Sequence, residues 1–307
     1  MSEEMKNKSV ETGAGSAAPN AKTYKRRSAA QEVWRRLRKN PGTMLGLTLI
    51  IVIVVIALAS GFIFDYDTQV VGQHITERLQ SPSAAHPFGT DELGRDIMAR
   101  VLYGARYSLS IGIVAVFVSL LVGVTLGAIA GYVGGVVENV IMRLVDIFLA
   151  IPSILLAIAV VSALGQSALN LMIAVGLCTV PSFAQVTRAS VLTVRNNEYI
   201  EASRAIGAND WHIIFSHILP NSLSPIIVQA TLRVGSAIIS ASALSFLGLG
   251  IPLPAPEWGA MLSGGRQYIR DYAYMTLFPG LAILLTVISF NLIGDGLRDA
   301  LDPKLKR

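Results

Sequence analysis

The chain has 307 residues, of which 52% are hydrophobic and only 15% are charged. Soluble domains carry roughly 25% charged residues, so the composition favours a membrane protein over a soluble one. The net charge of +5 would suggest a nucleic-acid partner for a soluble protein, but here most basic residues are interpreted as topological. The single cysteine, Cys178, excludes an intrachain disulfide and is interpreted as a packing residue.

Residues 1–39 form a polar, basic tail. Its first thirty residues are predicted to be disordered, and Trp34 to Asn40 is predicted to be a basic helix lying on the membrane surface. Residues 40–64 carry no charge, and a helix of this length, at about 1.5 Å per residue, exceeds the roughly 30 Å of hydrocarbon. The run starts too far from the N-terminus for a cleaved signal peptide, so we expect a first transmembrane helix near 43–64.

A polar loop is expected over 65–106, followed by the uncharged run 107–137. Within this run Gly123, Gly127 and Gly131 recur every four residues. Such a face of small residues lets two helices approach closely in lipid, so these glycines are predicted to pack against another span.

The uncharged stretch 147–187 would be about twice as long as a bilayer is thick if it were one helix. We therefore expect it to fold back at GQSALN, residues 165–170. The predicted spans after the first lie near 107–137, 141–163, 168–188, 224–249 and 274–294. The sequence thus predicts an all-α, polytopic membrane protein with six transmembrane helices.

Six spans place both termini on one side of the membrane, and the basic residues indicate which side. Eighteen of the 25 lysines and arginines lie in the two tails, near Arg143 and in the 188–220 loop, against six on the other face. Positively charged short loops stay in the cytoplasm, so both termini are predicted to be cytoplasmic. Residues 107–296 are interpreted as a five-helix core with a cytoplasmic loop over 190–221, and residues 297–307 as a cytoplasmic tail.

The 190–221 loop contains the segment EASRAIGANDWHIIFSHILPN, whose polar residues predict two short helices. Asn196 or Asn197 can cap the first helix, and Gly207 can end it in the left-handed conformation. Asn209 or Asp210 can cap the second helix.

This second helix is expected to run to about Leu219, where Pro220 interrupts it. Its apolar residues recur at three- and four-residue spacing: Trp211, Ile214, Phe215 and Ile218. Such a stripe needs a partner surface. Two alternatives to a partner protein are an amphipathic linker that packs on the chain's own spans and a DNA-binding helix-turn-helix, although spans close on both sides disfavour the latter.

The motif EASRAIG at 201–207, followed by ILP at 218–220, resembles the "EAA" loop of bacterial ABC-importer permease subunits. Ser203 stands where the family usually has a second alanine, and His217 where it usually has isoleucine. The resemblance implies that the loop forms a coupling helix that docks on a cytoplasmic ATP-binding subunit. Contacts with that subunit are expected from Glu201, Ala202, Gly207, Ala208, Asp210, Trp211, Ile214 and Phe215.

The stretch HPFGTDELGRDIMARVLYGARYSL at 86–109 is rich in glycines and charges. A metal site is one interpretation of its acids and histidine: His86, Asp91, Glu92 and Asp96. Hard cations need six or more oxygens in a defined loop, so a helix capped by Thr90 or Asp91 is favoured instead. Its apolar face would carry Leu93, Ile97 and Val101.

The same stretch resembles the loop before the second span in dipeptide, oligopeptide, glutathione and nickel importer subunits. The C-terminal segment FNLIGDGLRDALDPKLKR and the segment PEWGAML at 256–262 resemble the same subunits. The resemblance covers residues 86–307 almost without interruption.

Charged residues near the predicted spans are costly in lipid and usually have a partner. Arg143 and Asp146 are three residues apart and are expected to form a pair. Arg233 lies within the fifth span, where it either lines the pathway or extends its charge toward the interface. A solvated or subunit-facing cap is expected from Asp295, Arg298, Asp299 and Asp302.

The chain contains no GxxxxGK[ST] motif, nucleophile elbow or HExxH motif, so neither ATP binding nor catalysis is expected of it. The resemblance implies a permease subunit in the bacterial inner membrane, paired with a second, homologous permease chain. Two ATP-binding subunits would hold ATP and Mg²⁺, and an extracellular or periplasmic binding protein would deliver cargo. Lipid would surround the spans. No cofactor, metal or nucleic acid would bind this chain.

Di- or oligopeptides are the cargo that the resemblance favours, with nickel chelates or glutathione as alternatives. A secondary transporter driven by protons or ions would need acids near the membrane midplane, whereas the acids here lie at span ends. A purely structural scaffold would leave the apolar stripe of the 190–221 loop without a purpose.

Overall fold

The computed structural model describes residues 29–302, and every regular element within them is helical. Five helices are long and apolar enough to cross a membrane, and a sixth crossing results if one bent pair of helices counts as a single span. The prediction of an all-α, polytopic membrane protein is therefore confirmed. The disorder predicted for the start of the chain lies outside the described residues, as do Lys304, Lys306 and Arg307.

The helices follow one another as α1 (Ala29–Leu37), α2 (Pro41–Ile63), α3 (Ile97–Val133), α4 (Gly135–Ala150), α5 (Ser153–Leu164), α6 (Ala168–Arg195), α7 (Glu198–Ala205), α8 (Asp210–Ile213), α9 (Leu219–Phe246), α10 (Trp258–Gly265) and α11 (Tyr274–Leu301). Short turns of 3-10 or π geometry lie at Tyr66–Val70, Ile75–Glu77, Ile214–Ile218 and Arg266–Tyr268.

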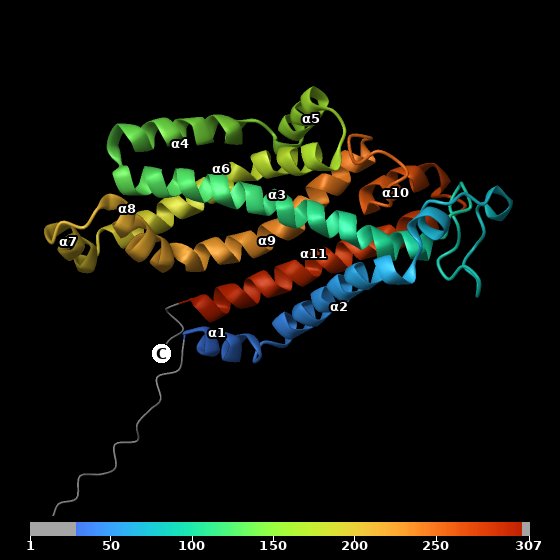
Figure 1. Ribbon diagram of the computed structural model, residues 1–307, viewed down its shortest axis with the longest axis horizontal. Coiled ribbons are helices and arrows are strands. Elements are labelled where there is room, and N and C mark those ends of the chain that lie inside the picture. Colours follow the sequence, from blue (N-terminus) through green and yellow to red (C-terminus); the bar gives the residue numbers. More distant parts are fainter. Residues whose placement is uncertain (1–28, 303–307) are drawn as a thin grey trace, which may run out of the picture.

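The long helices run side by side, so the molecule has two ends (Figure 1). One end carries α7 and α8, together with α1 and the end of α11; we call it the loop end. The opposite end carries α10 and the long connection from α2 to α3; we call it the far end. Both ends of the described chain thus lie at the loop end, as an even number of crossings requires. The side of the membrane on which the loop end lies stays a prediction.

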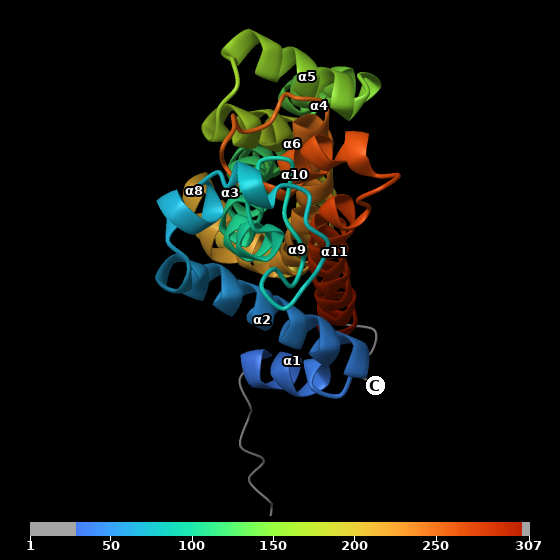
Figure 2. The ribbon, with the colours of Figure 1, turned by 90° about the vertical axis from the view of Figure 1, so that its right-hand side faces the viewer.

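The first span starts at a capped turn. The side-chain oxygen of Asn40 accepts a hydrogen bond from the backbone N–H of Gly42 at 3.0 Å, and Pro41 fits the first helical position because it needs no such bond. α2 then packs against α11, and α1 and α2 lie at the lower edge of the bundle in both views (Figures 1 and 2).

The centre of the bundle is the contact between α3 and α6. A Cβ atom added to Gly123 would lie 2.5 Å from the Cβ of Phe183, and one added to Gly131 would lie 2.9 Å from the Cβ of Val191. Gly127 between them faces the backbone of α6 just as closely. The three glycines therefore let the two helices touch along two turns, since any larger residue would push them apart.

The span predicted near 141–163 is not one straight helix. It consists of α4 and α5, which meet at an angle of 92° around Ile151 and Pro152. Pro152 has no N–H to continue the hydrogen bonds of α4, and it holds Ile151 in an extended conformation (φ −89°, ψ 126°). The fold-back predicted at 165–170 is present, because α5 ends at Leu164 and α6 begins at Ala168.

The start of α3 also differs from the prediction. Neither Thr90 nor Asp91 caps it; Asp96 does, through an Oδ1 that accepts from the N–H of Ala99 at 2.9 Å. The connection predicted over 65–106 therefore ends ten residues earlier, and α3 has 37 residues. At about 1.5 Å per residue it is longer than the hydrocarbon is thick, so part of it projects beyond the membrane.

Pro220 does not interrupt the helix that starts at Asp210. The preceding turn is a π turn, in which the N–H of Leu219 donates to the carbonyl oxygen of Ile214. Pro220 then takes a first-turn position of α9, where its missing N–H costs little. The segment Asp210–Phe246 consequently forms one continuous span of 37 residues.

Candidate functional site

The loop between α6 and α9 has the predicted local structure. Asn197 precedes α7, although its side chain does not cap the helix. Gly207 ends α7 with φ at +85°, a conformation that glycine adopts without strain. The N–H of Ala208 donates to the carbonyl oxygen of Ser203 at 3.1 Å, which closes the helix end, and Asn209 caps α8 by accepting from the N–H of Trp211 at 3.2 Å.

The predicted apolar stripe divides into a covered and an uncovered half. Ile214 and Ile218 are buried together with Ile213. They pack on the ends of the neighbouring spans, against the residues Ala128, Tyr132, Val191, Val194 and Ile200. Ile214 therefore faces the inside of this chain and is not available on the outer surface of the loop, which corrects its expected place among the docking contacts.

The uncovered half consists of large apolar side chains. Trp211 and Phe215 are 61% and 62% exposed, and their rings stack with centroids 6.1 Å apart. Ile206, which precedes the glycine of the loop, is 85% exposed. We call Ile206, Trp211 and Phe215 the exposed apolar set of the loop. Ile206 was not among the predicted contacts, because it lies outside the apolar stripe of the second helix.

The remaining predicted contact residues lie around this set. Glu201, Ala202 and Gly207 are exposed, and Ala208 is half-buried against the covered half of the loop. A Cβ atom on Gly207 would meet no atom within 4 Å. The surface around Gly207 is therefore open, and only its backbone conformation constrains the residue type.

Two polar contacts fix the loop to the end of α3. The hydroxyl of Tyr132 donates to a carboxylate oxygen of Asp210, and the guanidinium of Arg204 lies 5.1 Å from the centre of the Tyr132 ring. Asp210 is thus exposed but already bonded within the chain. Tyr132 was also missed in the sequence reading, because its role depends on how α3 and the loop meet in space.

The end of α6 is joined to α3 by Arg195, whose Nη1 donates to the carbonyl oxygens of Gly131 at 2.9 Å and Tyr132 at 3.2 Å. Such bonds use carbonyl groups that the end of α3 leaves unpaired. The loop is therefore attached on one side to α3 and α6, which are bonded to each other, and on the other side it continues into α9 without a break.

The expected pair of Arg143 and Asp146 is not formed; both side chains are exposed, and no ion pair joins them in the described part of the chain. The ion pair of this region instead connects Glu138 of α4 with Arg188 of α6, with Nε donating to Oε1 at 2.6 Å. His217 is half-buried, and its ring lies edge-on to that of His212, with centroids 5.5 Å apart.

Arg233 lies on α9, where it borders a cavity of about 300 Å³ between α5, α6 and α9. Its Nη2 donates to the hydroxyl of Ser182 at 3.0 Å. The residues expected to form a cap after the last span lie at the end of α11 or directly after it: Asp295, Arg298, Asp299 and Asp302.

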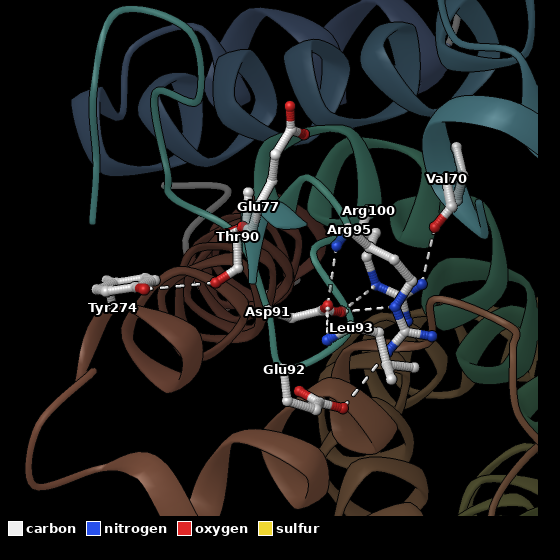
Figure 3. A network of polar contacts seen from close by, with 9 residues as sticks. All are labelled: Val70, Glu77, Thr90, Asp91, Glu92, Leu93, Arg95, Arg100 and Tyr274. Carbon is white, nitrogen blue, oxygen red and sulfur yellow. Dashed lines mark hydrogen bonds and ion pairs between the residues drawn. The ribbon is translucent and has the colours of Figure 1, made fainter. Parts of the chain in front are cut away.

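The charges of the 86–109 stretch form ion pairs at the far end (Figure 3). Asp91 accepts from Nε of Arg95 at 2.7 Å and lies 3.6 Å from Nε of Arg100, and all three residues are buried. His86 and Asp96 are joined at 2.9 Å. Within residues 29–302 no group of three or more possible ligands is placed to hold a metal.

Arg100 also donates from Nη1 to the carbonyl oxygen of Val70 at 2.8 Å, which attaches the connection after α2 to the start of α3 (Figure 3). Glu257, fully buried nearby, caps α10 by accepting from the N–H groups of Gly259 at 2.9 Å and Ala260 at 2.8 Å. Burial raises the pKa of Glu257 above its ordinary value, and these hydrogen bonds oppose the rise.

Two family models match this chain, and together they cover most of it. Residues 123–307 match the family described as binding-protein-dependent transport system inner membrane component. Residues 28–82 match the family described as N-terminal TM domain of oligopeptide transport permease C.

Two curated relatives and one solved structure carry the comparison further. The chain is 48% identical to the dipeptide transport system permease protein DppC of Alkalihalophilus pseudofirmus, over 94% of each chain. It is 47% identical to the glutathione transport system permease protein GsiD of Shigella flexneri serotype 5b, over 94% of this chain and 95% of the relative. An inward-facing MetNI methionine ABC transporter superposes with a TM-score of 0.57 at 19% identity, over 67% of this chain and 98% of that chain, which establishes a shared fold.

Proposed function

This chain belongs to the family of binding-protein-dependent transport system inner membrane components, and we propose that it forms, with a second permease chain, the translocation path of a peptide importer. It is a multi-pass protein of the bacterial inner membrane. Under this proposal, two ATP-binding subunits hold ATP and Mg²⁺ and hydrolyse the nucleotide, while an external binding protein delivers the cargo. This chain itself contributes the path and the coupling surface.

The exposed apolar set at the loop end carries the coupling part of the proposal. Ile206 lies between two spans, and Trp211 and Phe215 lie at the start of the 37-residue Asp210–Phe246 helix. At about 1.5 Å per residue this helix is longer than the hydrocarbon is thick, so we place its start outside the lipid. An apolar surface in water marks a protein interface. We assign the loop end to the cytoplasm because of the excess of lysines and arginines in the segments there. An ATP-binding subunit is the partner that this position favours.

The frame behind the loop supports transmission of movement. α6 enters the loop and the Asp210–Phe246 span leaves it without a break, so a displacement of the loop is passed to two spans as rigid bodies. Coupling of nucleotide state to the path requires that the ATP-binding subunit contact this surface differently in its two states.

The cargo follows from the relatives. One is named for dipeptides and one for glutathione, which is itself a small peptide. The class that both share is a short peptide with a free carboxylate. We therefore propose short peptides as cargo and treat glutathione as a member of that class.

A test of the function uses the complete importer in liposomes and measures peptide uptake and ATP hydrolysis. Gly207→Asp places a charge on the open surface of the loop and is expected to abolish uptake and uncouple ATP hydrolysis from it. Gly165→Asp is the matched control: Gly165 also has a positive φ (+86°) with no atom within 4 Å of a Cβ, but it follows α5, away from the loop. Full peptide uptake by Gly207→Asp would contradict the coupling assignment.

A further inference from the structure

A polar row runs along α9 in the middle of a membrane span. Gln229, Arg233, Ser236 and Ser240 follow one another at spacings of four, three and four residues, which places them on one face of the helix. Ser236 and Ser240 are exposed, and Arg233 is half-buried. Polar and charged side chains within a span face a water-filled path or another protein and avoid lipid.

Three members of the row, Arg233, Ser236 and Ser240, line the cavity of about 300 Å³ between α5, α6 and α9. The bend at Pro152 brings the start of α5 to this cavity, since Ser153 lines it. Thr179 of α6 adds a hydroxyl from a second side, and Ser236 and Ser240 add two more. The lining therefore contains one cation and several hydroxyl groups, but no carboxylate.

Arg233 is held in place by neutral groups. Its Nη2 donates to the hydroxyl of Ser182 at 3.0 Å, and with the amide of Gln229 turned toward it, Nε donates to the Gln229 oxygen at 2.9 Å. No described residue forms an ion pair with Arg233 or accepts a hydrogen bond from its Nη1. Nη2 also donates to the same Gln229 oxygen at 3.2 Å. The guanidinium is thus oriented, its charge is not paired within residues 29–302, and the two N–H donors of Nη1, out of five in all, have no partner there.

We propose that Arg233 receives the carboxylate of the peptide during its passage through the path. A planar guanidinium with free N–H groups matches a carboxylate in geometry and charge, and the effect is strengthened where water is scarce. Every linear peptide has a C-terminal carboxylate, whereas its side chains vary, so one fixed cation serves many cargoes. This inference rests on the proposed function, because it assigns a residue to the path of a peptide importer.

The test uses the complete importer in liposomes with a peptide and its C-terminal amide. Both are supplied at concentrations that saturate the binding protein, as checked by direct binding to it, so that delivery is equal. Uptake is compared for the unchanged chain, Arg233→Gln and Arg233→Lys. Arg143→Gln serves as the control, because it removes an exposed arginine that lies outside the cavity. Stimulation of ATP hydrolysis by the binding protein reports that each variant is folded and coupled.

We expect the unchanged chain to carry the free acid about ten-fold faster than the amide, which is the effect of one charge-assisted hydrogen-bonded contact. Arg233→Gln should remove this preference, while Arg233→Lys should keep part of it and Arg143→Gln all of it. An unchanged chain without a preference, or an Arg233→Gln variant that slows both peptides equally, would overturn the inference and leave the importer function intact. Uptake of neither peptide by the unchanged chain would overturn the proposed function itself.

Discussion

At the loop end, Ile206, Trp211 and Phe215 stand exposed, whereas at the far end Asp91, Arg95 and Arg100 are buried and paired with one another. The first region leaves apolar side chains in water, where they are least favoured. The second region buries charged side chains, although water is the environment in which a charge is most stable. Each arrangement is costly unless a partner compensates it.

The difference lies in where that partner is. At the far end the compensation is internal, because Asp91 also accepts from the backbone N–H groups of Leu93 and Arg95, and Val70 accepts from Arg100. The buried charges of the connection between α2 and α3 are therefore compensated within the chain, and we call this charge network the closed structure. At the loop end no side chain within residues 29–302 covers the exposed apolar set, which indicates a surface that another protein covers.

The strongest test of the closed structure is Asp91→Ala. It leaves Arg100 buried without an ion pair and Arg95 buried with only its 3.5 Å contact to Glu92, and removal of one partner from a buried ion pair costs about 3–5 kcal/mol. Thermal unfolding of the purified chain in detergent should show a markedly lower midpoint. Glu92→Gln is the control, because Glu92 lies at the partly exposed edge of the network and reaches Arg95 only at the longer distance of 3.5 Å. The expected loss in free energy of unfolding is roughly 1 kcal/mol or less. Equal midpoints for Asp91→Ala and the unchanged chain would contradict the account of this region.

The two halves of the loop can be separated by alanine substitutions. Ile218 is fully buried, so Ile218→Ala should lower the free energy of unfolding by about 2–5 kcal/mol. Ile206 is 85% exposed, so Ile206→Ala should change it by about 0.5 kcal/mol or less. The thermal midpoint of each variant, measured without partner subunits, checks both values. A large loss for Ile206→Ala would show that this residue supports the fold of the chain.

A smaller effect is expected from pH at the far end. The pKa of Glu257 is raised by burial, so the folded chain binds its proton more tightly than the unfolded chain does. This contribution to stability is present below the ordinary pKa of glutamate and is lost as pH rises through the raised pKa. Glu257→Gln cannot titrate, so its thermal midpoint relative to that of the unchanged chain should rise as the pH increases above the ordinary pKa of glutamate. A constant difference between the two midpoints would contradict the assignment.

The sequence predicts those features that depend on a few neighbouring residues. Gly207 and Asn209 fix the helix ends of the loop through backbone conformation and a side-chain cap, and both effects act within three residues. The spans could also be predicted, because the length of an uncharged run can be compared directly with the thickness of the hydrocarbon. Pro152 carried a signal for the bend between α4 and α5, although the length of the uncharged run concealed it.

The features that could not be predicted depend on contacts between distant segments. Tyr132 meets Asp210 only because α3 and the loop end together, and Arg188 meets Glu138 rather than a neighbour on its own helix. The apolar stripe of α8 and the π turn that follows it could be recognised, but its division into a buried Ile214 and an exposed Phe215 depends on where α3 and α6 lie.

The central claim is that the exposed apolar set of the loop binds the ATP-binding subunits. The most direct measurement compares the affinity of those subunits for the reconstituted unchanged chain and for the double variant Trp211→Ala, Phe215→Ala. We expect an unchanged thermal midpoint and at least about a ten-fold loss of affinity, because aromatic side chains dominate such interfaces. Equal affinity for both chains, at an equal midpoint, would contradict the claim.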